Sequence, residues 1–225
     1  RRHLDYWRFQ HWAIRTTLRW HADTYRALGV DIPMVGNYYP GGDVQNWREL
    51  SSQSPHGGAG CELLAIDWYP RNNFEGPPPP PGAREGESTG GGGIFGLSPR
   101  REERIFRDTC KLQQLVSPIP MIGEFECGVW HGYHEYTGAL TPSHYRRIFA
   151  AARESGIKAI NWYMLVGRDN WYYTPINERG DIRAELGEVF MDLHKSWRGE
   201  SAAAPAAPAR RDIAAYLDFE HIATD

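Results

Sequence analysis

The chain has 225 residues, which is enough for one domain with a hydrophobic core. Its formal net charge of −3 and pI near 6.3 give no electrostatic reason to expect nucleic acid or an anionic membrane surface as a partner. No apolar run is long enough to cross a membrane as a helix. Cys61, Cys110 and Cys127 are too few and too scattered for a disulfide framework or a zinc site, so no metal or cofactor is expected.

The first part of the chain predicts one long helix and two short strands. Apolar residues recur at helical spacing over residues 4–28, and Gly29 is placed to end that helix. Residues 31–37 and 62–67 are short apolar runs that predict strands. Between them, residues 43–52 predict a short helix.

The remainder alternates helices with strands. Residues 70–98 are rich in proline and glycine and predict a surface insertion without a packed core. Helices are then expected over 99–116, 141–155 and 183–197, and strands over 119–124 and 157–164. Residues 1–199 are expected to form one domain. An Ala/Pro linker follows at 200–211, and residues 212–225 are expected to begin a further domain.

Strands that are separated by helices predict an α/β fold with a parallel sheet and right-handed crossovers. The four β–α units expected here amount to half of a (β/α)8 TIM barrel, strands five to eight with their helices. A doubly wound open sheet is the alternative, but no glycine-rich nucleotide fingerprint follows any of the strands. The sequence therefore favours a barrel fragment.

Each predicted strand ends in polar or aromatic residues, as the strands of a barrel do where they form an active site. Asp67 and Asn37 have two interpretations, because such residues bind substrate or cap the loop that follows. At least one of Trp68 and Tyr69 is expected to face the cleft. The candidates for substrate binding at the strand ends are Asn37, Tyr38, Asp67, Trp68, Tyr69, Trp162 and Tyr163.

Glu124 is the most informative candidate for catalysis. Apolar residues run directly into this carboxylate, and Gly128 follows it at a turn. A carboxylate at the end of a buried strand is costly unless it has a partner or a task. Glu126 lies two residues further on; it is expected in the turn after the strand, with a second catalytic carboxylate as the less favoured alternative.

The motifs at the last two strands resemble those of clan A glycoside hydrolases, and most closely the family 35 β-galactosidases. Residues 124–128, Glu-Phe-Glu-Cys-Gly, are similar to the family's strand-seven Glu-Phe-Gln-x-Gly. Residues 161–164, Asn-Trp-Tyr-Met, resemble its strand-eight Asn-x-Tyr-Met, and residues 172–180 resemble the tyrosine-containing stretch that follows. The family's Gly-Gly-Thr is replaced by Gly167-Arg168-Asp169, which alters the rim of strand eight and bears on the identity of the sugar.

The resemblance implies a retaining hydrolase of terminal β-galactosides, or of related oligosaccharides and polysaccharides, with Glu124 as the nucleophile. It also implies that Tyr163 donates a hydrogen bond to the nucleophile and that Tyr172 lines the sugar subsite. Trp130, with His131 and His134, is expected in a loop at the substrate rim, which we favour over a metal site.

The second carboxyl is expected from outside the sequence. The family's acid/base glutamate belongs to an Asn-Glu at the end of strand four, which would precede Arg1; Asn177-Glu178 is read instead as a turn after strand eight. Two other functions remain open at this point. One is another clan A hydrolase of the family 42 galactosidase, cellulase or mannanase type, and the other is a non-catalytic barrel that binds carbohydrate.

Overall fold

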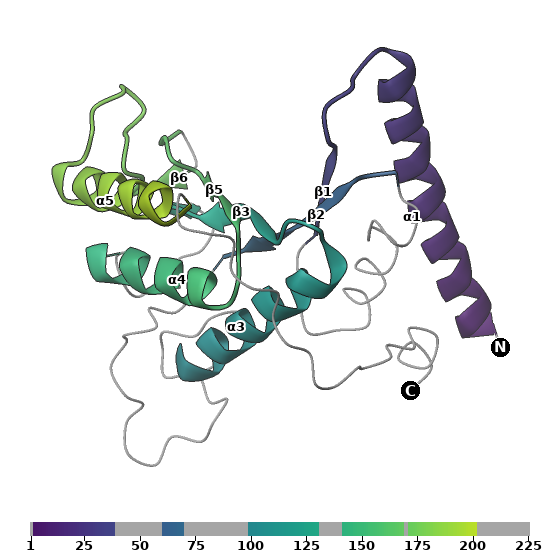
Figure 1. The fold of residues 1–225 in the computed structure, drawn as a ribbon, viewed down its shortest axis with the longest axis horizontal. Coiled ribbons are helices and arrows are strands. Elements are labelled where there is room, and N and C mark those ends of the chain that lie inside the picture. The colour runs from purple at the N-terminus through teal and green to yellow at the C-terminus, as the bar shows by residue number, and fades with distance from the viewer. Residues whose placement is uncertain (1, 39–59, 70–98, 131–140, 169–170, 202–225) are drawn as a thin grey trace.

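The computed structural model describes residues 2–38, 60–69, 99–130, 141–168 and 171–201 (Figure 1). The predicted helix at 43–52, the insertion at 70–98 and the segment at 212–225 lie outside these residues. None of the helices in the described ranges is long and apolar enough to cross a membrane. In chain order the elements are α1 (Arg2–Ala27), β1 (Val35–Tyr38), β2 (Leu63–Trp68), α3 (Pro99–Val116), β3 (Met121–Glu126), β4 (Val129–Trp130), α4 (Pro142–Glu154), β5 (Ala159–Tyr163), β6 (Trp171–Tyr172) and α5 (Ala184–Ser201).

Four strands form a parallel sheet in the order β1-β2-β3-β5. The predicted α/β class with a parallel sheet is therefore confirmed, and the sheet is compatible with part of a barrel. The short strands β4 and β6, which the sequence analysis did not foresee, pair antiparallel as a separate ribbon. Because all four sheet strands are parallel, their C-terminal ends lie along one edge.

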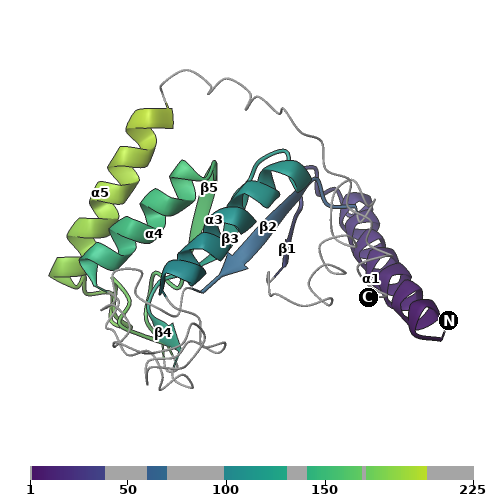
Figure 2. The same cartoon turned by 90° about the horizontal axis from the view of Figure 1, so that it is seen from below.

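The helices α3, α4 and α5 lie side by side along one face of the sheet, whereas α1 stands apart beyond β1 (Figures 1 and 2).

Local sequence explains where the helices begin and end. Thr141 caps α4 by accepting a hydrogen bond from the backbone N–H of His144 at 3.3 Å, and Pro142 occupies its first turn. Gly29 follows α1 with a φ of +90°, which only glycine adopts without strain.

The hydrophobic core lies between the sheet and these three helices. Phe125 of β3 is fully buried at its centre, with ring centroids 5.6 Å from Phe106 of α3 and 4.9 Å from Trp162 of β5. Tyr145 of α4 and Phe190 of α5 close the cluster around Trp162. Aromatic stacking thus joins two strands to all three helices that cover the sheet.

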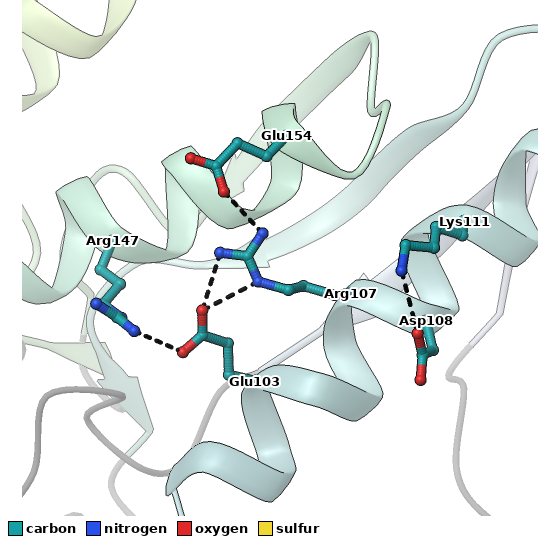
Figure 3. A network of polar contacts seen from close by, with 6 residues as sticks. All are labelled: Glu103, Arg107, Asp108, Lys111, Arg147 and Glu154. Carbon is teal, nitrogen blue, oxygen red and sulfur yellow. Dashed lines mark hydrogen bonds and ion pairs between the residues drawn. The ribbon is translucent and has the colours of Figure 1, made fainter. Parts of the chain in front are cut away.

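An ion-pair network holds α3 against α4 on the outside of this core (Figure 3). Glu103 accepts hydrogen bonds from Arg107 at 2.9 Å and from Arg147 at 2.9 Å, and Arg107 also donates to Glu154 at 2.8 Å. Partial burial alone would raise the pKa of Glu103, but the hydrogen bonds and charges of the two arginines outweigh it and lower the pKa below its usual value.

Replacing the central aromatic residue, Phe125→Ala, should lower the free energy of unfolding by about 3–5 kcal/mol, because it removes buried surface and leaves a cavity. The measurement is the midpoint of urea unfolding followed by circular dichroism. Phe9→Ala is the matched control, because Phe9 is 57% exposed on α1 and its loss should cost under about 1 kcal/mol. Equal losses for the two variants would contradict the assignment of the core.

Glu103→Gln should lower the free energy of unfolding by about 1–2 kcal/mol at pH 7. Because folding lowers the pKa of Glu103, its stabilisation is complete above the unfolded-state pKa and is lost as pH falls through the folded-state value. The difference between wild type and variant should therefore shrink below about pH 4, as measured by urea titrations at several pH values. Asp108→Asn, which removes an exposed pair with Lys111 on the same helix, should change stability little at any pH.

Candidate functional site

The residues that sequence analysis placed at strand ends do meet at the C-terminal edge of the sheet, but only five of the eight share a face. Successive side chains of a strand point to opposite faces. Asn37, Asp67, Glu124 and Tyr163 lie on the face turned away from α3, α4 and α5, on β1, β2, β3 and β5 respectively. Tyr69, one residue beyond β2, shares this face. We call this face of the C-terminal edge the polar edge.

Three of the predicted substrate-binding residues, Tyr38, Trp68 and Trp162, belong to the core instead. Tyr38 and Trp68 are buried, and the ring of Trp68 lies 5.0 Å from Phe106 of α3. Trp162 packs among the aromatic residues of α4 and α5. Each of them directly neighbours a residue of the polar edge in sequence, so strand alternation turns it toward the helices. Their side chains therefore lie on the face opposite Asn37, Asp67 and Glu124.

An irregularity in β3 places Glu124 on the polar edge. Ile122 and Phe125 both point into the core, although two residues separate them. In a regular strand, residues that point to the same face are separated by a single residue. The registers with β2 and β5 shift at this point, as in a β-bulge. Gly123 and Glu124 thereby both lie on the side away from the helices. Bulges of this kind re-aim side chains next to active sites.

Glu124 is half-buried and accepts a hydrogen bond from the hydroxyl of Tyr69. Burial and the adjacent Glu124 carboxylate raise the pKa of Tyr69, so this hydroxyl keeps its proton and remains a donor. Sequence analysis expected this donor to be Tyr163. The hydroxyl of Tyr163 instead accepts from Arg168 at 3.5 Å, and its ring meets that of Tyr69 edge-on at 6.3 Å.

Asp67 lies beside Glu124 on the neighbouring strand, since the two are paired in the register of β2 and β3. The side-chain amide of Asn37 donates to both oxygens of Asp67, at 2.8 and 3.0 Å. Burial raises the pKa of Asp67 to about 7; the hydrogen bonds from Asn37 oppose this shift and the charge of Glu124 adds to it. The loop from residue 70 lies outside the described residues, so the choice between a role in the site and a loop cap for Asp67 stays a prediction.

Aromatic rings form a wall beside Glu124. Tyr69, Tyr163 and Trp171 are in mutual edge contact, with centroid distances of 5.6–6.3 Å. Trp171 of β6 is buried, and its indole N–H donates to the carbonyl of Cys127 at 2.7 Å. The sequence analysis missed Trp171 and chose its neighbour Tyr172, which is 43% exposed. Trp130 pairs with Trp171 across the β4–β6 ribbon.

The structure corrects the expectation for the carboxylate of Glu126 and agrees with that for Glu178. Glu126 was expected in a turn, but it is the last residue of β3 and is almost fully buried, because the bulge lengthens the strand beyond Glu124. Glu178 is exposed in a turn built by Asn177, whose side-chain oxygen accepts from the backbone N–H groups of Arg179 at 2.9 Å and Asp181 at 2.8 Å. The interpretation of Asn177-Glu178 as a turn is thereby confirmed.

The predicted rim residues His131 and His134 lie outside the described residues. Within the described ranges, no group of three histidine, cysteine, aspartate or glutamate side chains is arranged to hold a metal ion. The polar edge thus offers two adjacent carboxyls, a phenol donor, amide groups and an aromatic wall. Such a set suits a polyhydroxylated ligand and chemistry that uses carboxylates.

No model of a known protein family and no curated protein matches this chain. The geometry of the polar edge therefore carries the functional argument.

Gly123 is the position where this geometry is tightest. A Cβ at Gly123 would lie 2.9 Å from the Cβ of Ala65 and 3.5 Å from that of Asn37. Gly123→Ala should therefore lower the free energy of unfolding by about 1–3 kcal/mol by forcing β2 and β3 apart. Urea unfolding measures the loss.

The double variant Gly123→Ala, Ala65→Gly tests the cause of that loss, because it removes the contacting methyl group. It should be more stable than the sum of the two single losses predicts. Strict additivity would show that the strain at Gly123 has another source.

Proposed function

We propose that this chain forms the C-terminal half of the (β/α)8 barrel of a retaining glycoside hydrolase that acts on terminal β-galactosides, with Glu124 as the nucleophile. The observation that carries the proposal is the position of the Glu124 carboxylate. It lies at the C-terminal edge of a parallel sheet, beside an aromatic wall, and accepts a hydrogen bond from a tyrosine. The C-terminal edge is where barrel enzymes place their catalytic groups.

The composition of the sheet's two faces supports the barrel part of the proposal. Three helices cover one face, as they cover the outside of a barrel. Near the C-terminal ends of the strands the other face carries small or polar residues, among them Ala65, Gly123 and Glu124, and Asn37 and Asn161 on the outer strands are exposed there. Closing the sheet with further strands would turn this face into a barrel interior.

The groups at the polar edge have the properties that a retaining mechanism requires. In that mechanism a carboxylate attacks the anomeric carbon, the glycosidic bond breaks, and a covalent glycosyl ester forms. The Tyr69 hydroxyl fixes the orientation of Glu124 for this attack. Asp67 and Asn37 offer acceptors and donors to sugar hydroxyls, and the half-buried rings of Tyr69 and Tyr163 offer apolar surface to the C–H groups of the sugar.

The second catalytic carboxyl protonates the leaving oxygen and then activates water. The resemblance to the family 35 enzymes assigns this role to an Asn-Glu on barrel strand four. Its counterpart is not found in the first thirty residues, and Glu178 lies in an exposed turn. The proposal therefore gives the chain the nucleophile and takes the acid/base group from a strand outside this sequence.

Incubation with 2-deoxy-2-fluoro-β-galactosyl fluoride should attach one fluorogalactosyl group to Glu124. Fluoride departs without a proton donor, so labelling needs the nucleophile but not the acid/base group. The fluorine slows hydrolysis of the ester, so the product accumulates. Intact-mass spectrometry and peptide mapping measure the stoichiometry and the site of labelling.

Glu124→Gln should abolish labelling, and Glu178→Gln, in the exposed turn, should retain it. A label on a different carboxylate would overturn the assignment of the nucleophile. Labelling by the gluco or manno fluoride in place of the galacto compound would instead indicate a clan A hydrolase of the cellulase or mannanase type. Absence of labelling by all three fluorides would defeat the proposed activity of this site.

A further inference from the structure

The pairing of Asp67 with Glu124 has a geometry of its own, independent of any substrate. The two residues are opposite each other in the register of adjacent parallel strands, and both carboxyls lie on the polar edge. Gly123 lies next to the pair, since a Cβ there would be in van der Waals contact with Oδ1 of Asp67, at 3.7 Å. Each carboxyl has its own neutral donor, Asn37 for Asp67 and Tyr69 for Glu124.

The other groups facing this pair do not neutralise it within the described residues. β3 contributes the carboxyls of Glu124 itself and of Glu126, the buried register partner of Tyr163. The end of β2 contributes the phenol of Tyr69, and beyond it lies the phenol of Tyr163 on β5. β1 contributes the neutral amide of Asn37. The guanidinium of Arg168 donates to the hydroxyl of Tyr163.

We infer that Asp67 is the proton-holding partner of Glu124: its half-buried carboxyl lies opposite the carboxyl of Glu124 on the neighbouring strand and keeps a proton in weakly acidic solution. Burial makes ionisation of Asp67 costly, and the Glu124 carboxyl adds a repulsion that no cation placed beside the pair in the described ranges offsets. The pKa of Asp67, raised to about 7 by burial and by Glu124, agrees with this assignment. Asn37 positions Asp67 and favours its ionised form.

The catalytic consequence of a proton on Asp67 rests on the proposed function. Ester formation converts Glu124 from an anion into a neutral group and builds positive charge on the sugar in the transition state. An ionised Asp67 favours both changes, because it loses a repulsion and faces a developing cation. Asp67 therefore acts through the charge of Glu124 and does not react itself. Glycosylation becomes faster as pH rises through neutrality, because more of Asp67 is then ionised.

The pair is tested directly by carbon-13 NMR titration of the side-chain carboxyl groups of Asp67 and Glu124 in the chain itself. We expect the Asp67 carboxyl to titrate near pH 7. Glu124→Gln should lower the Asp67 midpoint by removing the repulsion. Asn37→Ala should raise it by removing donors to the ionised form.

Asn161→Ala is the matched control, because it removes an amide hydrogen bond of similar length, 2.9 Å to the carbonyl of Gly123, without touching a carboxyl. It should leave the Asp67 midpoint in place. An Asp67 midpoint near the ordinary value of about 4 would overturn the inference, as would a midpoint that is the same in wild type and Glu124→Gln. The wild-type titration alone decides the first point if a variant does not fold.

The catalytic consequence is tested by the pH dependence of labelling with the fluorogalactosyl fluoride. The wild-type rate constant should rise on the order of tenfold between pH 6 and pH 8, and Asp67→Asn should give a flat profile. A flat wild-type profile, or the same rise in Asp67→Asn, would contradict the role of Asp67. Lack of labelling at every pH defeats the proposed hydrolase, whereas the NMR titration still decides whether Asp67 holds the proton.

Discussion

The alternation of side chains along parallel strands, with helices on one face only, is the constraint on which the whole arrangement depends. Asp67 and Trp68 are neighbours in sequence, yet one lies on the polar edge and the other in the core. The same holds for Glu124 and Phe125. A shift of one residue in register would exchange the two faces and bury the carboxyls against α3 and α4. The packing of the aromatic core therefore fixes which polar groups meet.

The bulge in β3 is where the core and the site make competing demands. Ile122 and Phe125 are both fully buried on the helix side, so the two residues between them must leave the core together. Glycine at 123 allows the strand to stay close to Ala65 while Glu124 turns toward Tyr69. Local irregularity thus delivers the carboxylate without loss of the aromatic stack on the opposite face.

Sequence reasoning predicted the elements better than the orientations of their residues. The bounds of α3 and the cap of α4 followed from Pro99 and Thr141, because helix starts have local chemical signals. No such local signal shows which residues at a strand end face the core when polar and aromatic residues alternate there. Trp162 and Tyr163 were both assigned to the site, although only one of two successive residues can face it.

Tertiary contacts decided the remaining differences between prediction and structure. The donor to Glu124 is Tyr69, one residue beyond β2, and residues 55 positions apart carry no local signal of such a contact. Trp171 reaches the aromatic wall through the pairing of two-residue strands, which are too short to produce a periodic pattern. The carboxylate itself was predictable because an acid at the end of an apolar run is unusual at any register.

The charge relation at the polar edge follows from these same positions and would strengthen as the site becomes more enclosed. Asp67 and Glu124 are half-buried on a face where Asn37 is exposed to water. Strands or substrate that covered this face would lower the local dielectric, which increases both the repulsion between the carboxyls and the strength of the Tyr69 hydrogen bond. Asp67 would then hold its proton more firmly in the occupied site than in the open one. The proton count of the pair would thus be coupled to ligand binding by electrostatics alone.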